Sequence, residues 1–190
     1  MSVTAFTDHI SVEEYIAREA RSAEKHDYVD GAVYAMAGAS EAHNTIAANL
    51  LGMLYGQLRG KACQPFGSDM KVWTRTAQGQ CFYYPDAIVS CDPTDQGHDW
   101  REKPSAIFEI ISEDTRRVDE REKRFMYFSI PGLLAYVRLE QARALVVVER
   151  PVAEGWITEH SMGLESILEL PELGLSLPLA ELYERVRLQS

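Results

Sequence analysis

Glu109 is the residue whose type and position most clearly indicate chemistry. It interrupts the apolar run of residues 106–111, and such a short run predicts a buried strand. In a strand, Glu109 shares one face with Ile107 and Ile111, and both faces look buried. An ionised carboxylate is costly to bury unless it is paired or binds a metal. Glu109 is therefore either a metal ligand or a structural carboxylate, at a sheet end or paired to an arginine.

Asp86 is the second candidate, in the segment Tyr84-Pro85-Asp86. A proline cannot donate to a sheet ladder, so Pro85 predicts a strand edge or a bulge. Bulges often direct a side chain towards a site. The alternative is an ordinary aspartate at a turn or strand end.

Lys123 is the third candidate and lies on a predicted helix over residues 119–129. It follows Asp119 by four residues, so one interpretation is a solvated pair on the helix surface. It also stands one turn before Met126 and Tyr127, at the margin of the apolar face. A long side chain there can lie along the core and place its ammonium group at a strand end.

The predicted elements that would position these residues follow from periodicity and turn residues. The clearest helix spans 41–58, where apolar residues recur every four positions behind Ser40, a good capping residue. We expect that stripe to pack on a sheet. Further helices are predicted over 11–21 and 178–187, and residues 92–104 read as a loop. Strands are predicted in 27–36, as a hairpin turning at Asp30-Gly31, and over 70–74, 81–90, 106–111, 134–139, 144–149 and 156–161.

This order predicts an α/β (α+β) domain, with one mixed β-sheet flanked by helices. The 190 residues suffice for one domain with its own core, so we expect a single domain over 1–190. With 46% hydrophobic and 25% charged residues, the composition is that of a folded globular chain.

Charge and cysteine content limit the function classes. A net charge of -10 argues against a general nucleic-acid coat, because coating phosphates requires Lys and Arg. Carboxylates at a metal site remain compatible with it. Cys63, Cys81 and Cys91 form no close pairs, which predicts three reduced thiols. Without a signal-peptide pattern at the start or a membrane-length apolar run, we expect a cytoplasmic protein with no membrane partner.

The features together resemble the PD-(D/E)XK nuclease superfamily, and within it the Uma-two family of restriction endonucleases. The resemblance covers roughly residues 11–148, and the order and spacing of its motifs carry it. In chain order the motifs are Tyr28-Val29-Asp30-Gly31, Ser40-Glu41-Ala42-His43, Tyr84-Pro85-Asp86, Phe108-Glu109-Ile110-Ile111-Ser112-Glu113-Asp114-Thr115, Asp119 with Lys123 and Tyr127, Pro131, and Ala135-Tyr136-Val137.

One position departs from the superfamily pattern. A lysine is expected two residues after Glu109, and Ile111 stands there. The resemblance implies a migrated lysine, for which Lys123 is the candidate. It also implies that Asp86, Glu109 and the carbonyl of Ile110 hold Mg²⁺ or Mn²⁺, hard ions that prefer oxygen ligands.

Two further residues receive roles from the resemblance. His43, three residues after Ser40, would contact phosphate or water at the rim of the site, or would be an ordinary histidine of a helix start. Asp27 would supply a third carboxylate, or would be a turn residue.

Three functions are compatible with these residues. The first is a Mg²⁺-dependent endonuclease that hydrolyses DNA phosphodiester bonds. The second is a catalytically inactive relative that serves as an interaction or DNA-binding module, and the third is an unrelated metal-dependent phosphoesterase. Fold alone does not separate them. A homodimer is a further hypothesis, because the apolar strand near residues 145–148 would need a covering helix or a symmetric partner.

Overall fold

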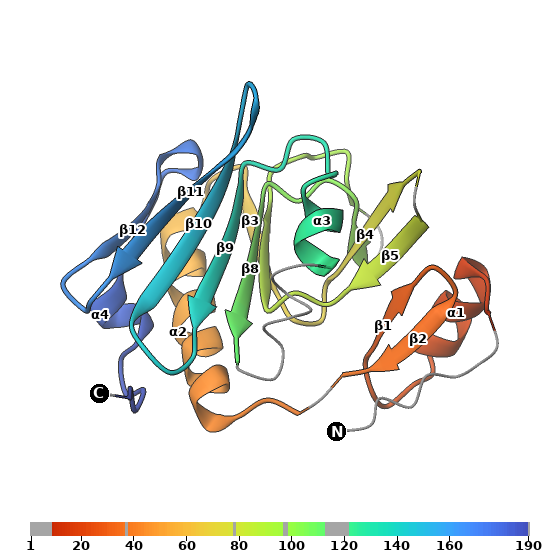
Figure 1. The fold of residues 1–190 in the computed structure, drawn as a ribbon, viewed down its shortest axis with the longest axis horizontal. Helices are drawn as coiled ribbons and strands as arrows, with labels where there is room; N and C mark the ends of the chain where they lie inside the picture. Colours follow the sequence, from red (N-terminus) through yellow and green to blue (C-terminus); the bar gives the residue numbers. More distant parts are fainter. Residues whose placement is uncertain (1–8, 37, 78, 97–98, 113–121, 190) are drawn as a thin grey trace.

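The computed structural model describes residues 9–36, 38–77, 79–96, 99–112 and 122–189. A six-stranded sheet forms its centre, α2 lies on one face of this sheet and α3 on the other (Figure 1). A five-stranded sheet lies to one side with α1, and a two-stranded sheet lies beside α4 (Figure 1). The expected mixed α+β architecture is confirmed, with strands divided among three sheets rather than gathered in one.

The six-stranded sheet is mixed, because β8 and β9 run parallel while its other described pairs are antiparallel. A parallel pair needs a crossover, and the chain between β8 and β9 includes α3 (Arg124–Tyr127). The strand order is β11 (Gly155–Met162), β10 (Leu145–Val152), β9 (Ala135–Glu140), β8 (Ala106–Ile111), β6 (Ala87–Ser90) and β3 (Gln64–Gly67).

The helix α2 (Glu41–Leu58) has the bounds that its sequence predicts. The Ser40 hydroxyl caps it by accepting the His43 backbone N–H at 3.1 Å. Its apolar stripe is buried against the six-stranded sheet, as expected. The stripe consists of Ile46, Leu50, Leu54 and Leu58, each at most 2% exposed.

The opposite face of this sheet carries α3. Met126 and Tyr127 are buried there against Ile88, Ile107 and other apolar residues of the sheet. Of the predicted helix over 119–129, the described part has α-helical residues only over Arg124–Tyr127, and Glu122 and Lys123 before it form a wider turn of π type. Asp119 and the rest of residues 113–121 lie outside the described residues.

The five-stranded sheet begins with the predicted hairpin. Asp30 and Gly31 both have positive φ, 44° and 94°, which suits the tight turn of a two-residue hairpin. A side chain at Gly31 would also collide with the ring of His9. The sheet order is β2 (Ala32–Ala35), β1 (His26–Val29), β5 (Gly79–Tyr83), β4 (Lys71–Thr76) and β7 (Trp100–Arg101).

The single strand predicted over 81–90 is wrong. The segment forms two strands in two different sheets: β5 pairs with β4 and β1, whereas β6 pairs with β8 and β3. Pro85 lies at the break, where its missing N–H could not continue a ladder. The interruption therefore connects the two sheets and places Asp86 where the chain enters the central one.

Of the other predicted elements, some are confirmed and others differ from the structure. The helix α1 (Val12–Glu19) and the hairpin of β9 and β10 are confirmed, as is the edge strand β11. The last helix, α4, covers only Leu179–Leu182 instead of residues 178–187. The pattern did not indicate β3, β7, β12 (Ile167–Leu170) or β13 (Leu175–Pro178), because these strands have only two to four residues each.

The strand near residues 145–148 does not need a covering partner. It belongs to β10, which pairs with β9 on one side and β11 on the other, and its residues are buried. The argument for a homodimer from this strand is therefore wrong, because an internal strand has no open edge.

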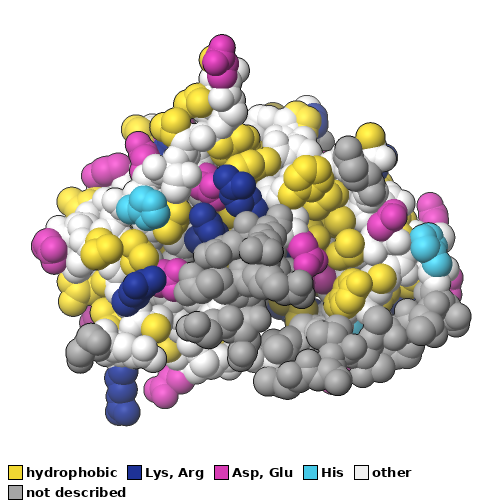
Figure 2. Space-filling model, viewed as in Figure 1, with side chains coloured by type: hydrophobic (Ala, Val, Ile, Leu, Met, Phe, Trp, Pro, Cys, Tyr) yellow, Lys and Arg dark blue, Asp and Glu magenta, His cyan; other side chains and the backbone are white. Residues whose placement is uncertain are grey.

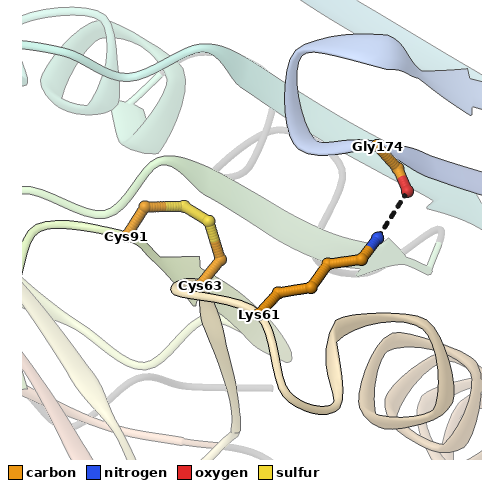
Figure 3. Close-up of a disulfide and its surroundings, with 4 residues drawn as sticks. All are labelled: Lys61, Cys63, Cys91 and Gly174. Carbon is orange, nitrogen blue, oxygen red and sulfur yellow. Dashed lines mark hydrogen bonds between the residues drawn. A yellow bond between two sulfur atoms is a disulfide. The ribbon is translucent and has the colours of Figure 1, made fainter.

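The prediction of three reduced cysteines is also wrong. Cys63 and Cys91 form a disulfide whose Cα atoms are 4.1 Å apart, and only Cys81 is free, and buried, among the described cysteines (Figure 3). The two half-cystines continue the antiparallel register of β3 and β6, in which Gln64 faces Ser90. Residues 28 positions apart were thus brought opposite one another by strand pairing. Within the described ranges, no helix is both long and apolar enough to cross a membrane.

Candidate functional site

Glu109 lies at the centre of the candidate site, in the buried strand β8, and is 4% exposed. Its Oε1 accepts a hydrogen bond from Lys123 Nζ at 3.1 Å and one from the Tyr127 hydroxyl at 2.9 Å. The carboxylate is thus paired to a cation and bonded to a neutral donor, as burial of a charge requires. Its side chain points to the face that α3 covers, because Tyr127 and Ile107 share one apolar cluster.

Lys123 reaches Glu109 from the turn that leads into α3. Only 8% of its side-chain surface is exposed, and its Nζ lies 5.7 Å from the centre of the Tyr83 ring. The aliphatic stem therefore lies in the core while the ammonium group meets the carboxylate. Lys123 and Tyr127 are four residues apart, which places both donors on the same side of this helical segment.

Tyr127 is fully buried, and its environment keeps it protonated. Burial raises the pKa of its hydroxyl well above the ordinary value, and the negative charge of Glu109 raises it further. The hydroxyl is thus a donor to Glu109 throughout the physiological pH range. The sequence carries one signal for Tyr127, its four-residue spacing from Lys123, because a second donor on that side of the helix reaches the same carboxylate.

Asp86 adjoins Glu109 on the neighbouring strand. Ala87 of β6 faces Phe108 of β8, so Asp86 enters the sheet beside Glu109. Its Oδ2 accepts the backbone N–H of Ile110, the residue after Glu109, at 2.6 Å. This bond replaces a ladder contact at the point where Pro85 interrupts the strand, and it fixes the aspartate at the start of β6.

His43 meets Asp86 from the other side of the sheet. Its Nε2 lies 3.0 Å from Asp86 Oδ1, and its own backbone is held by the Ser40 cap. Its Nδ1 is buried and makes no hydrogen bond within the described residues. The first turn of α2 thus brings an imidazole to the carboxylate that the β5–β6 break presents.

Asp27 lies in β1 and contacts the segment that carries Asp86. Its Oδ1 accepts the backbone N–H of Tyr84 at 3.1 Å. The Tyr84 hydroxyl donates in turn to Glu19 Oε1 at 2.9 Å, and its ring lies 5.3 Å from Lys71 Nζ. Tyr84 is therefore held at its backbone, hydroxyl and ring, which fixes the two residues that follow it.

The ligand atoms fit a hard divalent cation in chemical type. Asp86 and Glu109 offer carboxylate oxygens, and Ile110, which directly follows Glu109 and donates its backbone N–H to Asp86 Oδ2, offers a carbonyl oxygen. The described residues contain no group of three His, Cys, Asp or Glu side chains that could hold a metal. The acidic side chains of the described site would thus offer at most two ligands. A cation there would compete with Lys123 and Tyr127 for Glu109, and with His43 for Asp86.

The comparisons agree with this architecture. Residues 12–180 match the Uma2 family, described as "Putative restriction endonuclease", and the chain belongs to this family. Two proteins of Synechocystis sp., sll1609 and slr1290, are each 30% identical to it, over 89% and 92% of this chain and 97% and 91% of their own lengths.

A solved structure shares the fold. The crystal structure of a "putative nuclease belonging to DUF820" from Anabaena variabilis superposes with a TM-score of 0.72. The match covers 92% of this chain and 97% of that one, at 15% identity. At this identity the likeness establishes the restriction-endonuclease-like fold alone.

Proposed function

We propose that this chain is a metal-dependent endonuclease that hydrolyses phosphodiester bonds of DNA, with Asp86, Glu109 and Lys123 as its catalytic residues. The observation that carries the proposal is the bond from Lys123 Nζ to Glu109 Oε1. The superfamily pattern expects a lysine at the position of Ile111, and Lys123 supplies the missing ammonium group from another element. Membership of the Uma2 family and the nuclease-like fold support the same reaction class.

The metal ligands in this proposal are Asp86, Glu109 and the carbonyl of Ile110, and the ion is Mg²⁺ or Mn²⁺. When bound, the ion would lower the pKa of a coordinated water and neutralise charge on the phosphate. Lys123 orients the attacking water or stabilises the negative charge that develops on the phosphate oxygens. Tyr127 holds Glu109 in place through its hydrogen bond.

His43 and Asp27 have supporting roles. His43 contacts Asp86 Oδ1 and so orients that carboxylate at the rim of the site. We assign Asp27 as a positioning residue, because its Oδ1 holds the backbone of Tyr84, two residues before Asp86. The sequence also allows Asp27 as a third carboxylate ligand, and the D27N and D27A variants separate the two roles.

The remaining expectations stay predictions. We treat residues 1–190 as one nuclease-like domain that acts on DNA in the cytoplasm, and the homodimer loses its supporting argument because β10 is an internal strand. The disulfide between Cys63 and Cys91 is more typical of oxidising compartments, so it argues against the cytoplasmic prediction. The inactive DNA-binding relative is the alternative function, and the arrival of Lys123 at Glu109 favours the enzyme over it.

Cleavage of plasmid and single-stranded DNA with Mg²⁺ or Mn²⁺ tests the proposal. We expect D86N and E109Q to lose cleavage, because each removes a ligand charge, and K123M to reduce the rate by about 10²–10³ through loss of an electrostatic group. Calorimetric titration of Mn²⁺ should show weaker binding to D86N and E109Q. The matched control is E184Q, because Glu184 is a surface residue after α4 with 65% of its side chain exposed.

Stability must be separated from catalysis in these variants. Removing one partner of a buried ion pair costs about 3–5 kcal/mol, so E109Q and K123M will also melt earlier. D86N is the cleaner variant, because its side chain is 14% exposed. Cleavage by D86N at the wild-type rate, in protein that melts at the wild-type temperature, would refute the assignment.

A further inference from the structure

A cluster of two arginines and one glutamate lies beside the candidate site. Glu149 of β10 is 1% exposed. Its Oε1 accepts from Arg124 Nε at 2.7 Å, and its Oε2 accepts from Arg138 Nη2 at 3.0 Å. We call Arg124, Arg138 and Glu149 the arginine bracket. One buried carboxylate thus fixes two guanidinium groups that come from a helix and a strand.

The arginine bracket lies on the same face of the sheet as Glu109. Arg138 of β9 faces Glu109 of β8 in the parallel register, and paired residues of neighbouring strands direct their side chains to one face. Arg124 directly follows Lys123 in the chain. Among the described residues, the two guanidinium groups therefore follow Lys123 along this face, towards β10.

Aromatic rings hold the bracket in one geometry. The Arg124 guanidinium lies 4.3 Å from the centre of the Phe128 ring, and that ring stacks on Trp156 at 3.7 Å and 6°. Arg138 lies 5.7 Å from the centre of the Tyr136 ring. A guanidinium that is already ordered loses less conformational entropy when it binds a ligand.

The bracket joins two guanidinium groups to one carboxylate in a chain whose net charge is -10. The bond to Glu149 raises the pKa of Arg124, so its charge is permanent. Arg124 keeps 39% of its side-chain surface exposed. On the face shown in Figure 2, Lys and Arg side chains gather near the middle of the molecule beside an acidic one.

We propose that Arg124 and Arg138 bind the phosphate backbone of the nucleic-acid strand that the site cleaves, with Glu149 as the residue that positions both. The planar fork of a guanidinium matches two phosphate oxygens, which an ammonium group does not. Backbone binding of this kind carries no sequence information and sets the register of the strand on the protein. The inference rests on the proposed nuclease function and adds a substrate-binding surface to it.

The test measures binding of a short labelled DNA duplex in EDTA, where no cleavage occurs, over a series of salt concentrations. Each lost phosphate contact should reduce the slope of log affinity against log salt by about 0.9. We expect this reduction, with binding weakened several-fold, for R124Q and R138Q. R124K keeps the charge and should keep the slope while losing part of the affinity.

The matched control is R185Q, since Arg185 lies after α4 and has 87% of its side chain exposed. It should bind DNA with the wild-type slope. Melting temperatures identify any variant that is simply unfolded, and R124Q is the safer variant because its side chain is the more exposed of the two.

Two results would overturn the inference. One is a wild-type slope in folded R124Q and R138Q, and the other is no binding of DNA by the wild-type chain. The outcomes also separate the two proposals. Metal-dependent cleavage with an unchanged slope would retain the nuclease and reject the bracket. Bracket-dependent binding without any cleavage would retain the bracket and reject the nuclease.

Discussion

At the scale of single residues, the lysine of the candidate site comes from a different element than the superfamily pattern expects. Ile111 shares the face of Glu109 and is 1% exposed, so its apolar side chain brings no cation to that face. Lys123 supplies the ammonium from the turn before α3 and bonds to Glu109 at 3.1 Å. Its position depends on packing of Tyr127, and so on the helix rather than on the strand.

Asp27 allows a prediction at this scale, because an asparagine keeps the oxygen acceptor and removes the charge. If Asp27 holds the Tyr84 backbone, D27N should retain most of the cleavage activity, whereas D27A should lose activity and about 1 kcal/mol of stability. Cleavage rates and urea unfolding of the two variants check this. Loss of activity in D27N as complete as in D27A would instead assign Asp27 as a carboxylate ligand.

At the scale of elements, the break between β5 and β6 matters most. Pro85 ends one sheet and Asp86 begins the next, so the same interruption separates the sheets and presents a carboxylate. At the far end of β6, the Cys63–Cys91 disulfide joins this strand to the edge strand β3 (Figure 3). The strand that carries Asp86 is thus fixed at both ends.

The disulfide gives the prediction at this scale. Closing a loop of 28 residues restricts the unfolded chain and is worth about 3–4 kcal/mol on the entropic account. We therefore expect the double variant C63S/C91S, and the wild type with reductant, to unfold at lower urea concentration than the oxidised chain. Intact mass after alkylation under denaturing conditions without reductant should show one reactive thiol, that of Cys81. Three alkylated thiols would contradict the disulfide.

At the scale of the whole molecule, tyrosines occupy all parts of the core. Burial is the first cause that raises the pKa of each of six of them above the ordinary value near 10. Two lie at the candidate site, three in the region of α1, β1 and the β5–β6 connection, and one near α4. These are Tyr83 and Tyr127, then Tyr15, Tyr28 and Tyr84, and finally Tyr183.

These tyrosines predict an alkaline limit to stability. Because their folded pKa values are raised, the folded state holds their protons while the unfolded chain releases them above about pH 10. The stabilisation is fully present below the unfolded pKa and is lost as the pH rises above it. The Cys81 thiol, whose pKa burial raises to about 11, adds the same dependence over a slightly lower range. Urea midpoints should be level near neutral pH and fall steeply above about pH 10. Phenolate absorbance that rises in the folded protein, with no fall in the midpoint, would contradict this.

The local elements and the candidate residues Asp86 and Glu109 could be predicted from sequence, because they depend on neighbours in the chain. The four-residue repeat behind Ser40 determines α2, and the apolar run around Glu109 determines β8. Burial of Glu109 follows from that run, because a strand covered on both faces leaves no exposed position.

Contacts between distant residues were decided only by the tertiary structure. The division of residues 81–90 between two sheets, the disulfide of Cys63 with Cys91, and the bracket around Glu149 depend on strand order. Strand order is set by how apolar faces pack against each other, and a local pattern does not specify it. For Lys123, the sequence offered both a surface ion pair and a buried ammonium group. The packing of Tyr127 in the core selected the second, because it fixes the helical segment over the carboxylate of Glu109.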